Sequence, residues 1–166
     1  RGLGDVYKRQ IFLISQLLVQ NSFAAGSDGS SGGKDVSEYK QAVNLIKSAK
    51  KYEKKEKIEK AQKRYARAYK LLIKSNKKKP NNADTLNYLG FTSRKLGDFE
   101  NGEKFYLEGL AIDPKHIGIN EYLGELYVAT NRMDLARERL EVLMGCNCEE
   151  YNELKEIIDG TKKSKY

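Results

Sequence analysis

The 166-residue sequence has no tryptophan, two prolines, one histidine and two cysteines. Because proline ends helices, its scarcity, combined with 33% charged residues, indicates a helical chain. A complete zinc site needs four ligands, and a His-based triad would have to use His116, in a predicted loop between helices. The sequence also lacks the glycine-rich phosphate-binding motifs. We therefore interpret His116 as an ordinary loop residue and expect a non-catalytic protein that uses no metal and no cofactor.

The sequence also lacks an apolar run that is long enough to span a membrane as a helix. Residues 11–25 are apolar but fall short of the roughly 20 residues needed, and glutamines interrupt them. Such a run followed by small residues is typical of a secretory signal, with Ser22 and Ala24 at the −3 and −1 positions of the cleavage site. We predict a signal peptide over residues 11–24 and a periplasmic protein. An uncleaved membrane anchor is the alternative.

The segments on either side of this run are not expected to fold. Residues 1–10 contain no methionine, and Asp5 to Gln10 resemble the translation of a sequencing-library adapter. We interpret residues 1–10 as an adapter artefact, the alternative being a genuine basic start. Residues 25–34 are rich in glycine and serine, as in a flexible linker.

The net charge of +8 is unevenly distributed. Residues 34–80 hold 17 Lys/Arg and 5 Asp/Glu, whereas residues 81–166 hold 11 and 16. The basic block has three interpretations: a solvated helix face, a surface for an anionic partner or membrane, or a nucleic-acid site. Nucleic acid is the least favoured partner because no RNP-type or helix-turn-helix signature accompanies the block.

The two cysteines, Cys146 and Cys148, are separated only by Asn147. In an oxidising compartment such a pair forms a small disulfide that locks a turn, which is the interpretation we favour. Free thiols, or a redox or metal-binding role, are the alternatives.

An internal repeat of 34 residues organises the rest of the chain. Leu89-Gly90 and Leu123-Gly124 align without a gap, and apolar residues around them recur at helical spacing. Glycine inside a helix costs about 1 kcal/mol relative to alanine, which is tolerable where two helices must approach closely. The remaining repeat positions are small, aromatic or helix-ending residues: Gly102, Tyr106, Pro114 and Ala136.

This pattern resembles the tetratricopeptide repeat over residues 35–160. We predict repeats at about 42–82, 83–116 and 117–150, a closing helix over about 149–159 and a basic tail over 161–166. In the first repeat the closing Pro80 comes seven residues late, which predicts that the second helix of this repeat is about two turns longer.

The resemblance implies an all-α, right-handed superhelix whose concave groove binds a partner peptide or helix. Groove positions carried over from the family grade from basic to acidic: Lys50, Lys54, Asn87, Phe91, Arg94, Lys95, Glu121 and Glu125. We expect a protein partner with an acidic end near Arg94 and Lys95, because these cations form charge-assisted hydrogen bonds with carboxylates. The alternative is that these residues only solvate a spacer. The sequence does not identify the partner or the oligomeric state.

Overall fold

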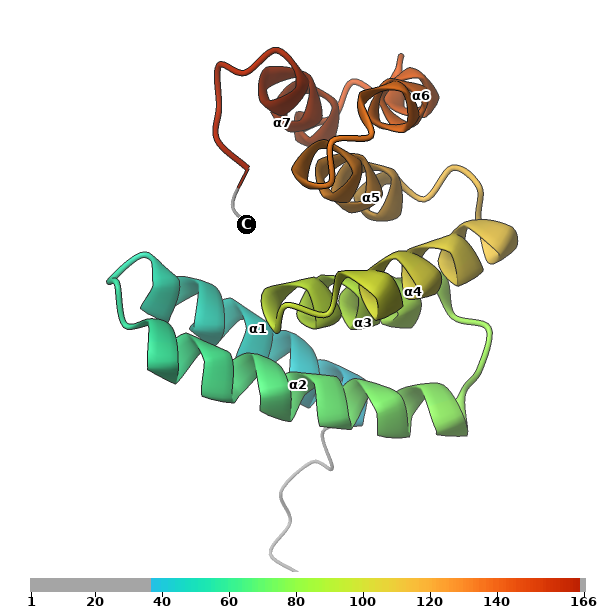
Figure 1. The fold of residues 1–166 in the computed structure, drawn as a ribbon. Helices are drawn as coiled ribbons and strands as arrows, with labels where there is room; N and C mark the ends of the chain where they lie inside the picture. Colours follow the sequence, from blue (N-terminus) through green and yellow to red (C-terminus); the bar gives the residue numbers. More distant parts are fainter. Residues whose placement is uncertain (1–36, 165–166) are drawn as a thin grey trace, which may run out of the picture. The chain divides into compact units, whose positions relative to one another are not determined.

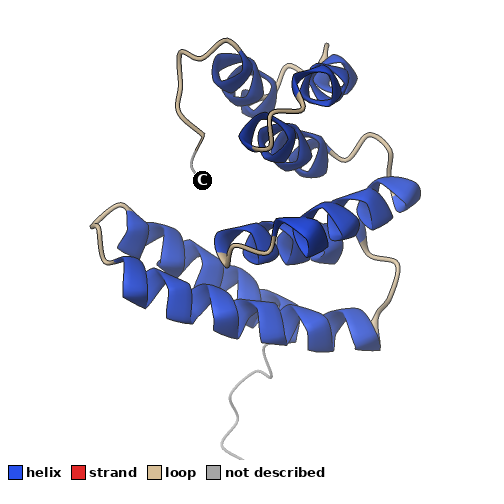
Figure 2. Cartoon of the chain, in the orientation of Figure 1, coloured by secondary structure: helices blue, strands red, loops and turns tan. Residues whose placement is uncertain are grey.

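A computed structural model describes residues 37–164, which contain seven helices and no strand (Figures 1 and 2). The predicted adapter segment, signal peptide and linker lie outside these residues. None of the described helices is sufficiently long and apolar to cross a bilayer. The helices are α1 (Glu38–Glu53), α2 (Ile58–Lys78), α3 (Ala83–Lys95), α4 (Phe99–Ile112), α5 (Ile117–Ala129), α6 (Met133–Leu143) and α7 (Glu149–Ile158).

The first six helices form three successive helix-turn-helix pairs, α1 with α2, α3 with α4 and α5 with α6, and α7 packs against the last pair (Figure 1). Side-chain caps begin several helices: Asn82 accepts a hydrogen bond from the Thr85 amide at 2.7 Å, and Asp98 accepts one from the Asn101 amide at 3.1 Å. Gly97 and Asn131, 34 residues apart, both have positive φ, at 86° and 59°. The same left-handed turn therefore closes the first helix of two repeats.

Helix α2 is the longest element of the described chain. It has 21 residues, compared with 14 in α4 and 11 in α6, and Pro80 follows its end. The residue before a proline is disfavoured in a helix, so the late proline lets α2 continue. Much of the added length is basic and exposed, as at Lys74, Lys77 and Lys78.

Glycines in α3 and α5 allow neighbouring helices to approach closely. A Cβ built on Gly90 would lie 2.4 Å from the Tyr106 ring of α4, which is too close for any real contact. A Cβ on Gly124 would lie 2.5 Å from Leu154, which belongs to α7 and not to the other helix of the same repeat. The closing helix therefore occupies the close-approach site of the third repeat.

A buried ion pair joins the second helix pair to the third. The Arg94 side chain of α3 has no exposed surface, and its Nη2 lies 3.5 Å from Oε2 of Glu125 on α5, which is also buried. The Arg94 Nη1 donates a hydrogen bond to the Tyr122 carbonyl. Arg94 therefore compensates a buried carboxylate and satisfies a backbone oxygen of the neighbouring helix.

The close approach at Gly90 leads to a stability prediction. Gly90→Leu should lower the free energy of unfolding by more than about 1 kcal/mol, since the side chain has to displace the Tyr106 ring and separate α3 from α4. The matched control is Ala111→Leu, at an exposed position of α4, where a change within about 0.5 kcal/mol is expected. Urea unfolding measures both variants. Equal unfolding midpoints for Gly90→Leu and the parent would show that α3 does not present Gly90 to α4.

The buried ion pair leads to a second prediction. Arg94→Leu should destabilise the protein by about 3–5 kcal/mol because the buried Glu125 carboxylate loses the cation that pairs with it. Adding Glu125→Leu should recover part of that loss, which a double-mutant cycle in urea can measure. A double variant that is less stable than Arg94→Leu alone would contradict the pairing.

Candidate peptide-binding groove

A hollow of about 700 Å³ opens where the first helix of each pair meets the closing helix. We call it the groove. Its lining residues come from α1, α2, α3, α5, α7, the turn after α1 and the C-terminal tail: Lys50, Glu53, Lys54, Ile58, Phe91, Lys95, Tyr122, Glu153 and Lys162.

The floor of the groove is aromatic. The rings of Phe91 and Tyr122 lie 5.2 Å apart, and Phe91 packs edge-on against the buried Tyr65 ring at 5.8 Å. Lys50 extends over this floor, with its Nζ 4.6 Å from the centre of the Phe91 ring and 3.4 Å from the Tyr122 hydroxyl. Burial raises the pKa of Tyr122, so its hydroxyl stays neutral and can both donate and accept hydrogen bonds.

The walls carry charges of both signs. Lys95 Nζ lies 3.0 Å from Glu53, which also accepts a hydrogen bond of 2.8 Å from the Tyr65 hydroxyl. At the opposite end of the sequence, Lys162 Nζ lies 2.9 Å from Glu153. Lys54, in the turn after α1, is exposed. The groove therefore combines an apolar floor with lysines and glutamates along its edges.

The residues predicted for the groove separate into two sets. Lys50, Lys54, Phe91 and Lys95 line it, although Phe91 is only 2% exposed. Asn87, Arg94, Glu121 and Glu125 are instead buried between helices. The expectation that a partner carboxylate pairs with Arg94 is therefore corrected, because Glu125 already pairs with this side chain and no part of it is exposed.

Five further residues line the groove and were not among the predicted positions: Glu53, Ile58, Tyr122, Glu153 and Lys162. In α5, the positions carried over from the family were Glu121 and Glu125, which are buried in the interior. The neighbouring Tyr122, which was not among them, lines the groove. Glu153 and Lys162 belong to the closing helix and the basic tail, to which the repeat pattern does not extend. The one available signal for the tail was its positive charge.

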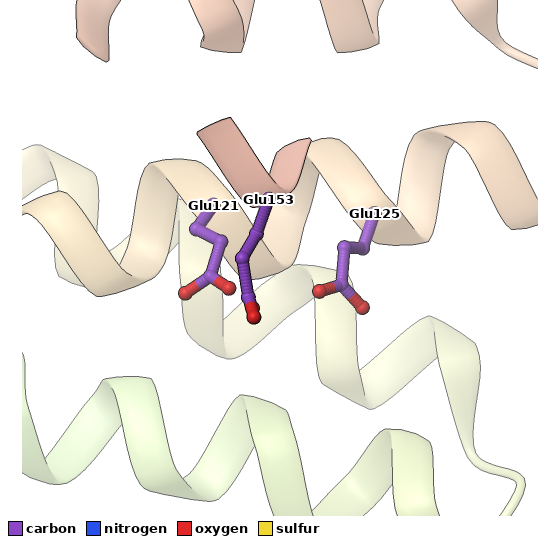
Figure 3. Close-up of side chains that lie close together, drawn as sticks. All are labelled: Glu121, Glu125 and Glu153. Carbon is purple, nitrogen blue, oxygen red and sulfur yellow. The ribbon is translucent and has the colours of Figure 1, made fainter. Parts of the chain in front are cut away.

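Three carboxylates gather beside the groove (Figure 3). Glu121, Glu125 and Glu153 each offer one oxygen atom, and these atoms lie within 4.8 Å of one another. Carboxylate oxygens are the ligands of hard cations such as Ca²⁺. In this cluster, however, Arg94 pairs with Glu125 and Lys162 with Glu153, so protein cations already lie beside the carboxylates. The prediction that the protein uses no metal stays a prediction.

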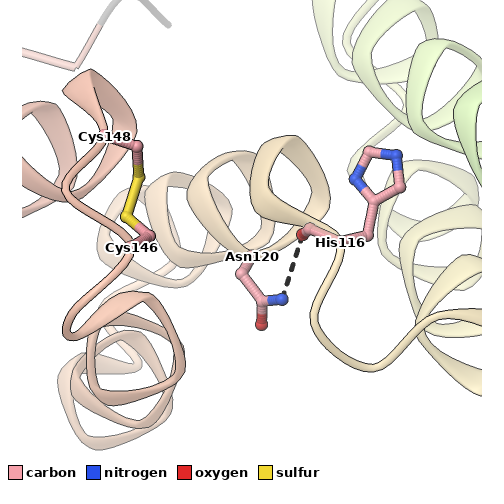
Figure 4. The surroundings of a disulfide bond; sticks show 4 residues. All are labelled: His116, Asn120, Cys146 and Cys148. Carbon is pink, nitrogen blue, oxygen red and sulfur yellow. Dashed lines mark hydrogen bonds between the residues drawn. A yellow bond between two sulfur atoms is a disulfide. The ribbon is translucent and has the colours of Figure 1, made fainter.

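His116 and the cysteines do not line the groove. They lie at the ends of helices (Figure 4). His116 caps α5: its Nδ1 accepts a hydrogen bond from the Ile119 amide at 3.1 Å, and its Nε2 lies 3.2 Å from Asp84. The histidine predicted as an ordinary loop residue is therefore half-buried and structural. Cys146 and Cys148 form a disulfide in the turn between α6 and α7.

Comparison with known proteins gives similarity at the level of structure only. No protein-family model matches the chain, and no curated protein matches its sequence. The type III secretion translocator chaperone SycD of Yersinia enterocolitica superposes with a TM-score of 0.52 at 14% identity, over 71% of this chain and 81% of that one.

Two tetratricopeptide-repeat domains that were solved with bound peptides are also similar. The first such domain of Spaghetti (RPAP3), bound to the HSP90 peptide SRMEEVD, has a TM-score of 0.48 at 21% identity, over 74% of this chain and 94% of that one. The second domain of human RPAP3, in complex with an HSP70 peptide, has a TM-score of 0.46 at 17% identity, over 74% and 98%. The described chain has the all-α helical repeat fold of tetratricopeptide-repeat proteins.

Proposed function

We propose that this protein is a non-catalytic adaptor that holds a segment of another protein in the groove. The observation that carries the proposal is the aromatic floor of Phe91 and Tyr122 beneath Lys50. Pockets that bind ligands typically combine an apolar surface with a few placed polar groups, and this floor has that composition. The solved domains that bind HSP90 and HSP70 peptides are consistent with a protein partner.

The chemistry of the groove defines the class of partner segment. An apolar side chain of the partner would pack on the half-buried Tyr122 ring, which itself packs on the buried Phe91 ring, while an acidic group would reach Lys50 and Lys54 at the edge. Lys95 is less available, because only 8% of its side chain is exposed and Glu53 lies 3.0 Å away. The acidic group therefore belongs at the α1 side of the groove rather than near Arg94.

The cell envelope is the compartment that we propose for this activity. The predicted signal peptide would export the chain, and disulfides persist in oxidising compartments such as the bacterial periplasm. The Cys146–Cys148 bond is consistent with that environment. The adaptor would then act on a partner in the periplasm or at the membrane surface.

Selection from a random-peptide library on the purified full-length chain tests the groove. We expect enriched peptides to combine a large apolar residue with acidic residues, and Lys50→Glu/Lys54→Glu to weaken their binding by about tenfold or more, because repulsion replaces charge-assisted contacts. Fluorescence anisotropy with labelled peptides measures the affinities.

The matched control is Lys47→Glu/Lys51→Glu, which makes the same charge change at the same spacing on α1. Both residues are exposed and neither lines the groove. Their reversal should change the affinity by no more than about twofold, since only the overall field is altered. Equal losses in the two variants, or enrichment of peptides without acidic residues, would refute the groove assignment.

The proposed compartment predicts a specific mass. Protein isolated from the envelope fraction without reductant should weigh two hydrogen atoms less than its reduced form, as one intramolecular disulfide requires. Cys146→Ser should abolish this difference. Recovery of the native chain with both thiols free, in the cytoplasmic fraction, would contradict the proposal of an exported adaptor.

A further inference from the structure

A second hollow, of about 410 Å³, lies between α1 and α2 and shares no lining residue with the groove. We call it the basic hollow. It is lined by one leucine, one tyrosine and four cations, with no acidic residue: Leu45, Tyr52, Lys60, Lys63, Arg64 and Arg67.

Helix geometry places the basic hollow on a different side of α1 from the groove. Leu45 and Tyr52 are seven residues apart, which is nearly two full turns, so they share one face of α1. Lys50, at the edge of the groove, projects from the other side of the same helix. A ligand in the basic hollow therefore leaves the groove accessible.

The four cations of α2 form a continuous stripe. Lys60, Lys63, Arg64 and Arg67 follow the i, i+3, i+4, i+7 pattern, which puts them on one helix face. Like charges at these spacings destabilise a helix. Within the part of the chain that the structure describes, none of the four forms an ion pair with an acidic side chain. The fold therefore keeps an unfavourable concentration of positive charge that an anionic ligand would relieve.

Tyr52 lies in the basic hollow beside these cations. The Arg64 guanidinium carbon lies 5.0 Å from the centre of the Tyr52 ring. A hydrogen bond from Arg64, with added attraction from Arg64, Lys60 and Lys57, lowers the pKa of the Tyr52 phenol. Stacking on the ring also restricts the guanidinium, which reduces the entropy lost when it binds an anion.

We infer that the basic hollow is a binding site for a ligand with two linked phosphate groups. A phosphate group carries between one and two negative charges near neutral pH, so two of them balance the four cations, whereas a single carboxylate does not. The arginines offer paired N–H donors that match phosphate oxygens, and the lysines add point charges. This site goes beyond the peptide-binding activity proposed for the groove.

Titration of the full-length, ¹⁵N-labelled chain with inorganic pyrophosphate at low ionic strength tests the site. We expect amide shifts concentrated in residues 60–67, and Lys60→Gln/Lys63→Gln to weaken binding by about tenfold while the control Lys74→Gln/Lys77→Gln changes it by no more than about twofold. The control removes the same two charges at the same spacing from the same helix, outside the basic hollow.

The outcomes distinguish the source of the phosphate. Vesicles of phosphatidylcholine with and without cardiolipin, whose headgroup links two phosphates through glycerol, are tested in parallel. Pyrophosphate binding joined by Lys60/Lys63-dependent binding to the anionic vesicles assigns the site to lipid headgroups, and pyrophosphate binding alone assigns it to a soluble phosphate compound. Equal weakening in both variants, or no binding of pyrophosphate, would overturn the inference. None of these measurements involves peptide binding in the groove. Either proposal can therefore be refuted without refuting the other.

Discussion

The buried contact of Arg94 with α5 is the interaction on which the shape of the groove depends. Arg94 forms an ion pair with Glu125 and donates a hydrogen bond to the Tyr122 carbonyl. These two contacts hold this part of α5 beside the C-terminal end of α3. This placement brings the Tyr122 ring to 5.2 Å from Phe91 and completes the aromatic floor. A charged residue that the family pattern assigns to partner binding thus acts here as an internal link between repeats.

Sequence periodicity predicted the helices and their turns because these depend on local chemistry. The Leu-Gly pairs and the displaced Pro80 each identify an element from its own residues. Whether Arg94, Glu121 and Glu125 are buried depends instead on which helices pack against them. Helical spacing alone does not distinguish an exposed groove position from a buried position next to it. The same reason explains why Tyr122 was overlooked.

The contributions of α7 and the tail were unpredictable for another reason. Glu153 and Lys162 lie beyond the last repeat, so no repeat position assigns them a direction. The place of Glu153 follows from Leu154, which fills the space above Gly124, so that the preceding residue of α7 faces the groove. A single small residue in α5 consequently sets one wall of a site that is formed largely by other helices.

That same contact also determines the surface of the array at α7. Arrays of stacked repeats need a terminal element with a polar outer face. Leu154 occupies the space above Gly124, and α7 turns Asn152, Lys155 and Glu156 to solvent. The contact at Gly124 therefore replaces the apolar face of the third helix pair with a polar surface.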